Sequence, residues 1–234
     1  LTRLAKLDSM TDTEMTRELK ASMIDPGAPS PSVEAILHAI IPYKFVDHTH
    51  TDAVVAISNS PNGEQLLRDI YGERVLILPY IMPGFVLARQ VYESTKDMDW
   101  KSIEGIVLLH HGLFTFNNSA RVSYDKMIEL VNLAEGHLAG IGALEDIAVA
   151  SYATTQDDHL ALARARQAAS RHFKAPMIAT WLTDPKSLGF SKIEGIAEIA
   201  TRGPVTPDHT LQTKRIPAIL DQDPEAAIDQ FAAD

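Results

Sequence analysis

Two histidines stand one residue apart in the stretch FVDHTHTDAVVA, residues 45–56, which is rich in residues typical of strands. On a strand, residues i and i+2 project from the same face, so His48 and His50 would point their rings in one direction. Two such rings can bind one metal ion at about 2.0–2.1 Å. The chain has no cysteine, so any metal site must use His, Asp or Glu. The pair is therefore a candidate part of a metal site.

A catalytic zinc site needs a third protein ligand and an open coordination position. The apolar segment IEGIVLLHHGLFTF, residues 103–116, is predicted to be a buried strand ending in a turn at His110, His111 and Gly112. Because strand residues alternate in direction, only one of the two histidines would face the first pair. Gly112 would let the backbone turn tightly at the metal. The alternative to a metal site is a surface pair or a hydrogen-bonded core pair of histidines.

Glu34 and Tyr80 are further candidates, each with two interpretations. Glu34 lies four residues before His38 in PSVEAILH, on one face of a predicted helix. It is either a first-turn carboxylate favoured by the helix dipole or a general base whose pKa would rise in an apolar pocket. Tyr80 follows a buried strand and is either a core phenol or a proton donor.

The glycines of GHLAGIG, residues 136–142, match the phosphate turn of short-chain dehydrogenases. Such a turn must follow a strand and open a helix, so that backbone amides meet the pyrophosphate. Here the preceding residues have a helical pattern, and the glycines are better explained as the end of a helix. No coenzyme site is predicted.

The elements that must position these residues alternate along the chain. Helices are predicted in residues 9–23, 33–41, 63–72, 83–94 and 119–139, and strands in residues 74–81 and 103–116. Residues 44–57 are predicted to begin as a strand and to run into a helix near Ala53. This order predicts an α/β or α+β layered domain over residues 1–140. A helical and strand extension is expected over residues 141–203, with a strand at residues 176–183. The proline-rich residues 204–234 are expected to form a linker or arm.

Composition narrows the classes of partner. The net charge is −10 and the pI is near 5.3, which argues against nucleic acid or an anionic membrane surface as a partner. No apolar run approaches the ~18–20 residues of a membrane span, and LTRLAKLDSM lacks the core of a signal peptide. A soluble cytoplasmic protein is expected.

Four motifs together resemble the class II aldolase/adducin family: PSVEAILH, DHTHTDA, LPYIMPG and LLHHGLFTF, in this order between about residues 28 and 139. The chain is most similar to the aldolase half of long bacterial proteins that fuse this domain to a short-chain dehydrogenase. The resemblance implies a mostly antiparallel or mixed central sheet flanked by helices, with a C-terminal α/β extension. It also implies an N-terminal helix, early strands and a glycine-rich loop, and no such pattern opens this chain.

The resemblance implies that zinc, or another divalent transition metal, is bound by His48, His50 and His111. His110 stands where the family usually has asparagine, so it is the second choice. Glu34 matches the family's general base, which is also an occasional metal ligand.

Two further residues match positions that contact substrate in the family. Tyr80 lies where a tyrosine crosses a subunit boundary to protonate the leaving aldehyde. Ser32 matches the first of two serines that hold substrate phosphate, and Val33 replaces the second.

The implied activity is retro-aldol cleavage of a ketose, expected to be a ketose 1-phosphate, through a metal-stabilised enediolate. The expected partners are a small sugar or sugar phosphate, further copies of the chain in a homo-oligomer, with a tetramer favoured, and a fused dehydrogenase domain. An epimerase or dehydratase with the same metal triad is one alternative. A non-catalytic adducin-like oligomerisation module is the other.

Overall fold

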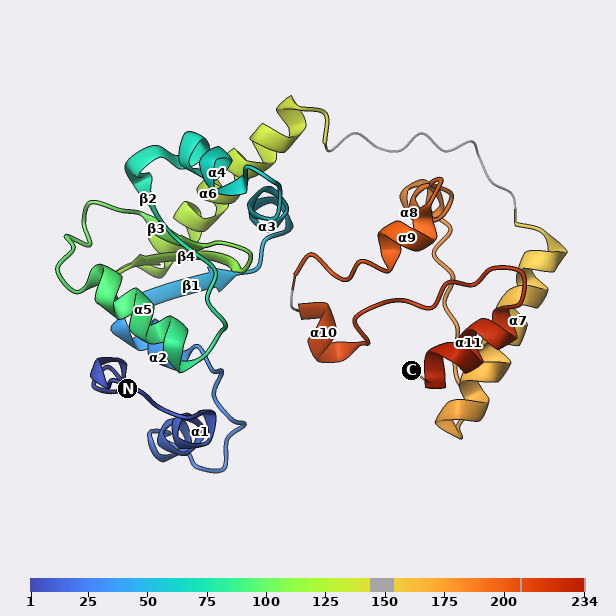
Figure 1. Ribbon diagram of the computed structural model, residues 1–234, viewed down its shortest axis with the longest axis horizontal. Coiled ribbons are helices and arrows are strands. Elements are labelled where there is room, and N and C mark those ends of the chain that lie inside the picture. The colour runs from blue at the N-terminus through green and yellow to red at the C-terminus, as the bar shows by residue number, and fades with distance from the viewer. Residues whose placement is uncertain (144–153, 207, 234) are drawn as a thin grey trace. The chain divides into compact units, whose positions relative to one another are not determined.

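The computed structural model describes residues 1–143, 154–206 and 208–233. The chain divides into two compact units, the first formed by residues 1–143 with 205–206 and the second by residues 154–204 and 208–233 (Figure 1). All the candidate residues named above lie in the first unit.

A four-stranded mixed sheet forms the centre of the first unit, in the order β1-β4-β3-β2. The strands are β1 (Phe45–Thr49), β2 (Val75–Leu78), β3 (Gly105–Leu108) and β4 (Gly112–Asn117). Strands β2 and β3 are parallel, whereas β4 is antiparallel to both of its neighbours. The predicted layered fold with a mixed sheet flanked by helices is confirmed.

The segment 103–116 is a hairpin, and its prediction as one strand is wrong. Leu108 pairs with Gly112, which leaves Leu109–His111 as a three-residue loop between β3 and β4. Such loops usually contain one residue in the left-handed conformation, most often glycine. Here that residue is His110, with φ of 58°. The turn is predicted at His110, His111 and Gly112, but the apolar run on both sides does not show that a second strand, paired with the first, follows it.

The helices predicted for the first unit are confirmed, and all but the first lie against a face of the sheet (Figure 1). They are α1 (Asp12–Ala21), α2 (Ala35–Ile40), α3 (Asp52–Ser58), α4 (Gly63–Tyr71), α5 (Phe85–Thr95) and α6 (Ala120–Gly140), with short 3₁₀ turns at Leu4–Lys6 and Gly72–Arg74. A capping box opens α1, since Thr11 and Glu14 bond each other's backbone N–H.

Strand alternation divides the core between the two faces of the sheet. Ile106 and Phe114 pack with α1, α2 and α5, whereas Val107 and Leu113 pack with α3, α4 and α6. His48 lies on the first of these faces, where its ring stacks on Phe114. The candidate site therefore borders the core that α2 and α5 cover.

The glycine-rich stretch at residues 136–142 lies at the end of a helix. Gly136 and Gly140 are inside α6, and Gly142, with φ of 73°, follows it. A phosphate turn must follow a strand, whereas these glycines end a helix, as the sequence pattern indicated.

The second unit contains helices α7 (Gln156–Phe173), α8 (Pro185–Ser191), α9 (Ile196–Ala200), α10 (Asp208–Gln212) and α11 (Pro224–Ala233). The strand predicted at residues 176–183 is wrong, because this segment has no regular structure. No strand in the described part of this unit offers a pairing edge, and α7 side chains bond the segment's backbone instead. Met177 N–H donates to Ser170 Oγ at 3.1 Å, and Arg166 donates to the Met177 carbonyl at 3.3 Å.

Residues 204–234, expected as a linker or arm, include α10 and α11. Helix α11 packs on α7, and Arg171 bonds Glu225 at 2.7 Å while His172 lies 2.8 Å from Asp229. The division at residue 204 stays a prediction.

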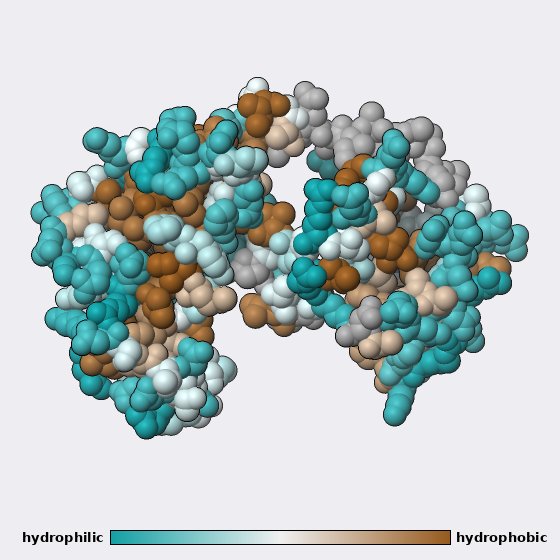
Figure 2. Space-filling model, viewed as in Figure 1, coloured by the Kyte–Doolittle hydropathy of each residue, from teal (hydrophilic) through white to brown (hydrophobic). Residues whose placement is uncertain are grey.

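The surface of both units mixes hydrophilic residues with apolar patches on the face drawn in Figure 2. Exposed apolar side chains include Met82 and Val86, which are 70% and 64% exposed in and just after the segment between β2 and α5. Within the described residues, no helix is both long and apolar enough to span a membrane.

Candidate metal centre

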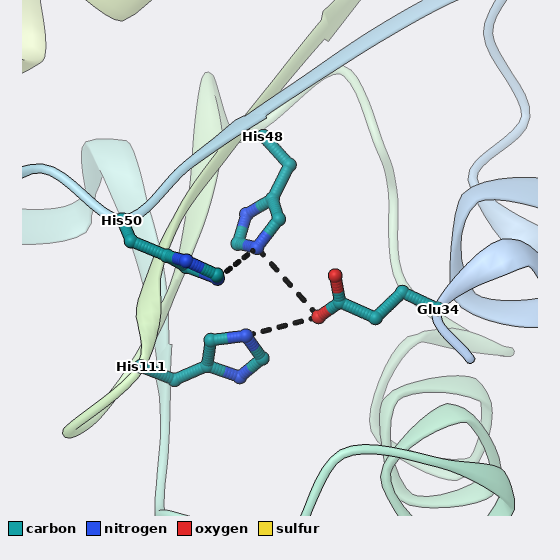
Figure 3. Close-up of side chains that lie close together, drawn as sticks. All are labelled: Glu34, His48, His50 and His111. Atoms are coloured by element: carbon teal, nitrogen blue, oxygen red, sulfur yellow. Dashed lines mark hydrogen bonds and ion pairs between the residues drawn. The ribbon is translucent and has the colours of Figure 1, made fainter. Parts of the chain in front are cut away.

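Four side chains from three separate elements converge at one end of the sheet (Figure 3): Glu34, His48, His50 and His111. Glu34 immediately precedes α2, His48 is in β1 with His50 just after it, and His111 is in the β3–β4 loop. One ligand atom from each lies within 4.8 Å of all the others. The structure therefore brings together residues that are up to 77 positions apart in the chain.

The spacing of the donor atoms fits a metal ion. Ligands at the corners of a tetrahedral zinc site lie about 3.3 Å apart when each bond is about 2.0–2.1 Å. Nε2 of His48 lies 3.0 Å from Nε2 of His50. Oε1 of Glu34 lies 2.9 Å from Nε2 of His111 and 3.6 Å from Nε2 of His48. These distances lie on both sides of the tetrahedral value, so a small adjustment would surround an ion.

His48 is held with its Nε2 facing the cluster. Its Nδ1 donates to the Leu113 carbonyl at 3.1 Å, and its ring stacks on Phe114 with centroids 3.8 Å apart and planes 11° apart. A nitrogen that faces a carbonyl must carry the proton, so Nε2 of the neutral ring keeps its lone pair. The β1–β4 register places His48 opposite Phe114 and thereby produces this orientation.

Burial lowers the pKa of His48 to about 4, although the nearby carboxylate of Glu34 acts in the opposite direction. Burial also lowers the pKa of His38, whose ring lies against Phe114. Because neutral imidazole is the form that binds metal, His48 is ready to coordinate at neutral pH.

The expected rise in the pKa of Glu34 is not found. Burial does raise this pKa, but the contact with Nε2 of His111, 2.9 Å away, acts in the opposite direction, and the pKa is lowered overall. Glu34 is therefore a carboxylate at neutral pH. Within the described residues, its buried Oε1 and Nδ1 of His111 make no hydrogen bond. A buried anionic oxygen without a hydrogen bond, facing imidazole nitrogens, fits a bound cation.

Gly112 allows β4 to lie close to β1 at the site. The tight turn that was expected at Gly112 is made by His110 instead. A Cβ on Gly112 would lie 2.4 Å from the Thr49 carbonyl and 3.0 Å from Cε1 of His48. Its φ is not positive. Only glycine, which has no side chain, fits at this position of β4 beside the histidine pair.

Comparison with known proteins identifies the family. A family model described as the class II aldolase and adducin N-terminal domain matches residues 5–138, more than half of the chain. The chain belongs to this family. A model described as the second domain of class II aldolases matches residues 156–234. The family inferred from the four sequence motifs is confirmed.

Two relatives of this class II aldolase-like chain are informative. The N-terminal class II aldolase domain of a conserved protein from Thermoplasma acidophilum is 46% identical, with a TM-score of 0.53 over 58% of this chain and 62% of that one. The uncharacterized oxidoreductase YuxG of Bacillus subtilis (strain 168) is 34% identical over 229 residues, which are 95% of this chain and 33% of that protein. The chain thus spans about a third of the length of this curated relative.

Three other candidate residues lie outside the cluster. The His110 ring faces Asn59 and the edge of Tyr80. Tyr80 is 47% exposed, and its hydroxyl lies 3.8 Å from the sulfur of Met82. Ser32 is exposed two residues before Glu34, and its hydroxyl accepts the Glu34 N–H at 3.2 Å.

Sequence reasoning missed Phe114 and the Leu113 carbonyl, which orient His48. The alternation of residues in LFTF predicts a strand, but it does not indicate which strand pairs with it. Only the pairing of β4 with β1 shows that His48 lies against them.

Proposed function

We propose that this chain is a zinc-dependent aldolase domain that cleaves a ketose, expected to be a ketose 1-phosphate, by a retro-aldol reaction. The observation that supports this most is the convergence of His48, His50, His111 and Glu34 in a family of class II aldolases. Three imidazoles and a carboxylate suit zinc and related divalent transition metals.

The three histidines would hold the ion, and the position opposite them would be open to substrate oxygens. The bound ion supplies Lewis-acid stabilisation of the negative charge that develops on those oxygens as the C–C bond breaks. The chain's own part is to keep the site ordered. His48 cannot rotate freely, because Leu113 and Phe114 hold its ring on two sides.

Glu34 would move the proton at the carbon next to the substrate carbonyl. Its carboxylate is ionised, 13% exposed in its side chain and directed at the histidines, as Figure 3 shows. A base must be unprotonated and within reach of the carbon, and the low pKa of Glu34 satisfies the first requirement. If Glu34 also serves as a fourth ligand in the resting site, substrate would have to displace it.

Tyr80 and Ser32 would act on the ends of the substrate. Tyr80 is exposed and its ring faces His110, outside the four-residue cluster of its own chain, which agrees with a role as proton donor in a neighbouring copy of a homo-oligomer. Ser32 precedes Glu34, and its hydroxyl hydrogen could be donated to a phosphate oxygen.

The name and length of YuxG support one more part of the proposal, that the chain is the aldolase portion of a longer protein with an oxidoreductase portion.

Metal content and product analysis test the function. Chain purified without chelator, or reconstituted with zinc, should contain about one zinc per chain, and His111→Ala should lose it. His137→Ala is a matched control, since His137 lies in the last turn of α6 outside the cluster. Incubation with ketose 1-phosphates should release dihydroxyacetone phosphate. An isomeric sugar as the only product would favour the epimerase instead, and absence of zinc after reconstitution would reject both enzymes.

A further inference from the structure

The loop that presents His111 to the cluster contains a conformation that needs support. His110, its middle residue, has φ of 58°. This left-handed region is unfavourable for residues other than glycine, and such residues persist only where their surroundings hold them. Among the described residues, Lys174 is the only other non-glycine residue with positive φ.

The end of α3 holds His110 through two hydrogen bonds. The backbone N–H of His110 donates to Oγ of Ser58 at 2.5 Å, and Nδ1 of its ring donates to Oδ1 of Asn59 at 2.6 Å. Ser58 is the last residue of α3 and is 2% exposed, whereas Asn59 follows the helix and is exposed. One bond orients the backbone and the other orients the ring.

Helix α3 also lies close in the chain to His50, another candidate ligand. It begins at Asp52, two residues after His50, and ends at the residues that hold His110. The same short helix therefore follows one candidate ligand directly and supports the loop that carries another.

The conformation of His110 decides where His111 points, because the two residues are adjacent and the backbone angles of the first set the direction of the second. In the observed conformation His111 is 3% exposed, with Nε2 2.9 Å from Oε1 of Glu34. A relaxation of His110 to negative φ would turn His111 away from Glu34.

We infer that Ser58 and Asn59 are positioning residues of the metal centre, which hold His110 in the left-handed conformation and so direct His111 at the ion. This inference rests on the proposed function, since it assigns roles in the same site. Neither residue needs to touch metal or substrate.

The test is the zinc affinity of the full chain, measured by competition with a fluorescent chelator. Asn59→Ala should bind zinc about tenfold more weakly, the usual size of such an effect. Asn59→Asp keeps an acceptor oxygen and should bind within about threefold of the unchanged chain. Asn62→Ala is the matched control, because Asn62 makes no side-chain cap bond at the start of α4; its affinity should not change.

His110→Gly supplies the second arm, since glycine adopts positive φ without support. Its zinc affinity should stay near that of the unchanged chain, and adding Asn59→Ala to it should cause no further loss. An Asn59→Ala chain that melts at a lower temperature but binds zinc equally well would overturn the inference, and so would a tenfold loss that persists in the His110→Gly background. Failure of the unchanged chain to bind zinc would instead reject the proposed function, and this inference with it.

Discussion

At the scale of single residues, the candidate centre depends on how each imidazole is oriented and protonated. His48 has one nitrogen committed to the Leu113 carbonyl and the other directed at His50 and Glu34. Burial keeps this ring neutral well below neutral pH. The same property that prepares His48 for metal makes the metal-free chain sensitive to acid.

The free energy of unfolding of the metal-free chain should fall as the pH is lowered from about 6.5 to about 4. The pKa of His48 is about 4 in the folded chain, against 6.5 as its ordinary value. Between these values the unfolded chain binds one more proton, so acid favours unfolding by at most about 1.4 kcal/mol per pH unit. The buried ring of His38 contributes in the same direction.

Urea unfolding with chelator present, at pH 7 and pH 5, would measure this dependence. Trp181→Phe leaves Trp100, which packs against Phe116, as the fluorescent reporter of the first unit. His48→Asn should reduce the difference between the two pH values, whereas His137→Asn should not. An equal pH dependence in the His48→Asn chain would contradict the assigned pKa.

At the scale of elements, the centre is made by the close approach of β1, the β3–β4 loop and the start of α2. Figure 3 shows Glu34 reaching the histidines from the opposite side. At Gly112, β4 lies so near β1 that any side chain would overlap the Thr49 carbonyl.

Gly112→Ala should therefore damage the centre without replacing any of its ligands. The added Cβ would have to lie 2.4 Å from a backbone oxygen, so the strands must separate. We expect a loss of about 1–3 kcal/mol in the free energy of unfolding, as for other overpacked positions, and a fall in zinc affinity of about tenfold or more.

Gly140→Ala provides the matched comparison, because no atom lies within 4 Å of a Cβ at this position in α6. It should leave zinc affinity unchanged and stabilise the helix by up to about 1 kcal/mol. Urea unfolding and chelator competition measure both quantities. If Gly112→Ala and Gly140→Ala had the same zinc affinity and the same free energy of unfolding, β1 and β4 would be shown to tolerate separation.

At the scale of the whole molecule, all four candidate ligands belong to the first of two compact units. Zinc added to the metal-free chain should raise the melting transition reported by Trp100 and leave the transition reported by Trp181 unchanged. At about one hundred times its Kd, zinc should stabilise the first unit by about 2.7 kcal/mol.

Single-tryptophan chains, Trp181→Phe and Trp100→Phe, separate the two transitions. His50→Ala should abolish the zinc-dependent shift of the Trp100 signal. A shift of equal size in the Trp181 signal would show that the two units melt together.

The sequence by itself determined the family, the helices of the first unit and the same-face relation of His48 and His50. These follow from local periodicity and from residue order, which do not depend on distant contacts. It also led correctly to a mixed sheet flanked by helices. It was wrong about residues 103–116 and 176–183, because whether an apolar run becomes one strand, two strands or none depends on which partners are available for its backbone.

Only the tertiary structure decided how the centre is assembled. The pairing of β4 with β1 placed Phe114 and the Leu113 carbonyl against His48, and the left-handed residue His110 brought His111 to Glu34. Tertiary contacts also reversed the expected pKa of Glu34, since the contact with His111 acts against burial. Orientation and protonation depend on atoms that are distant in the chain, and the order of residues does not specify those distances.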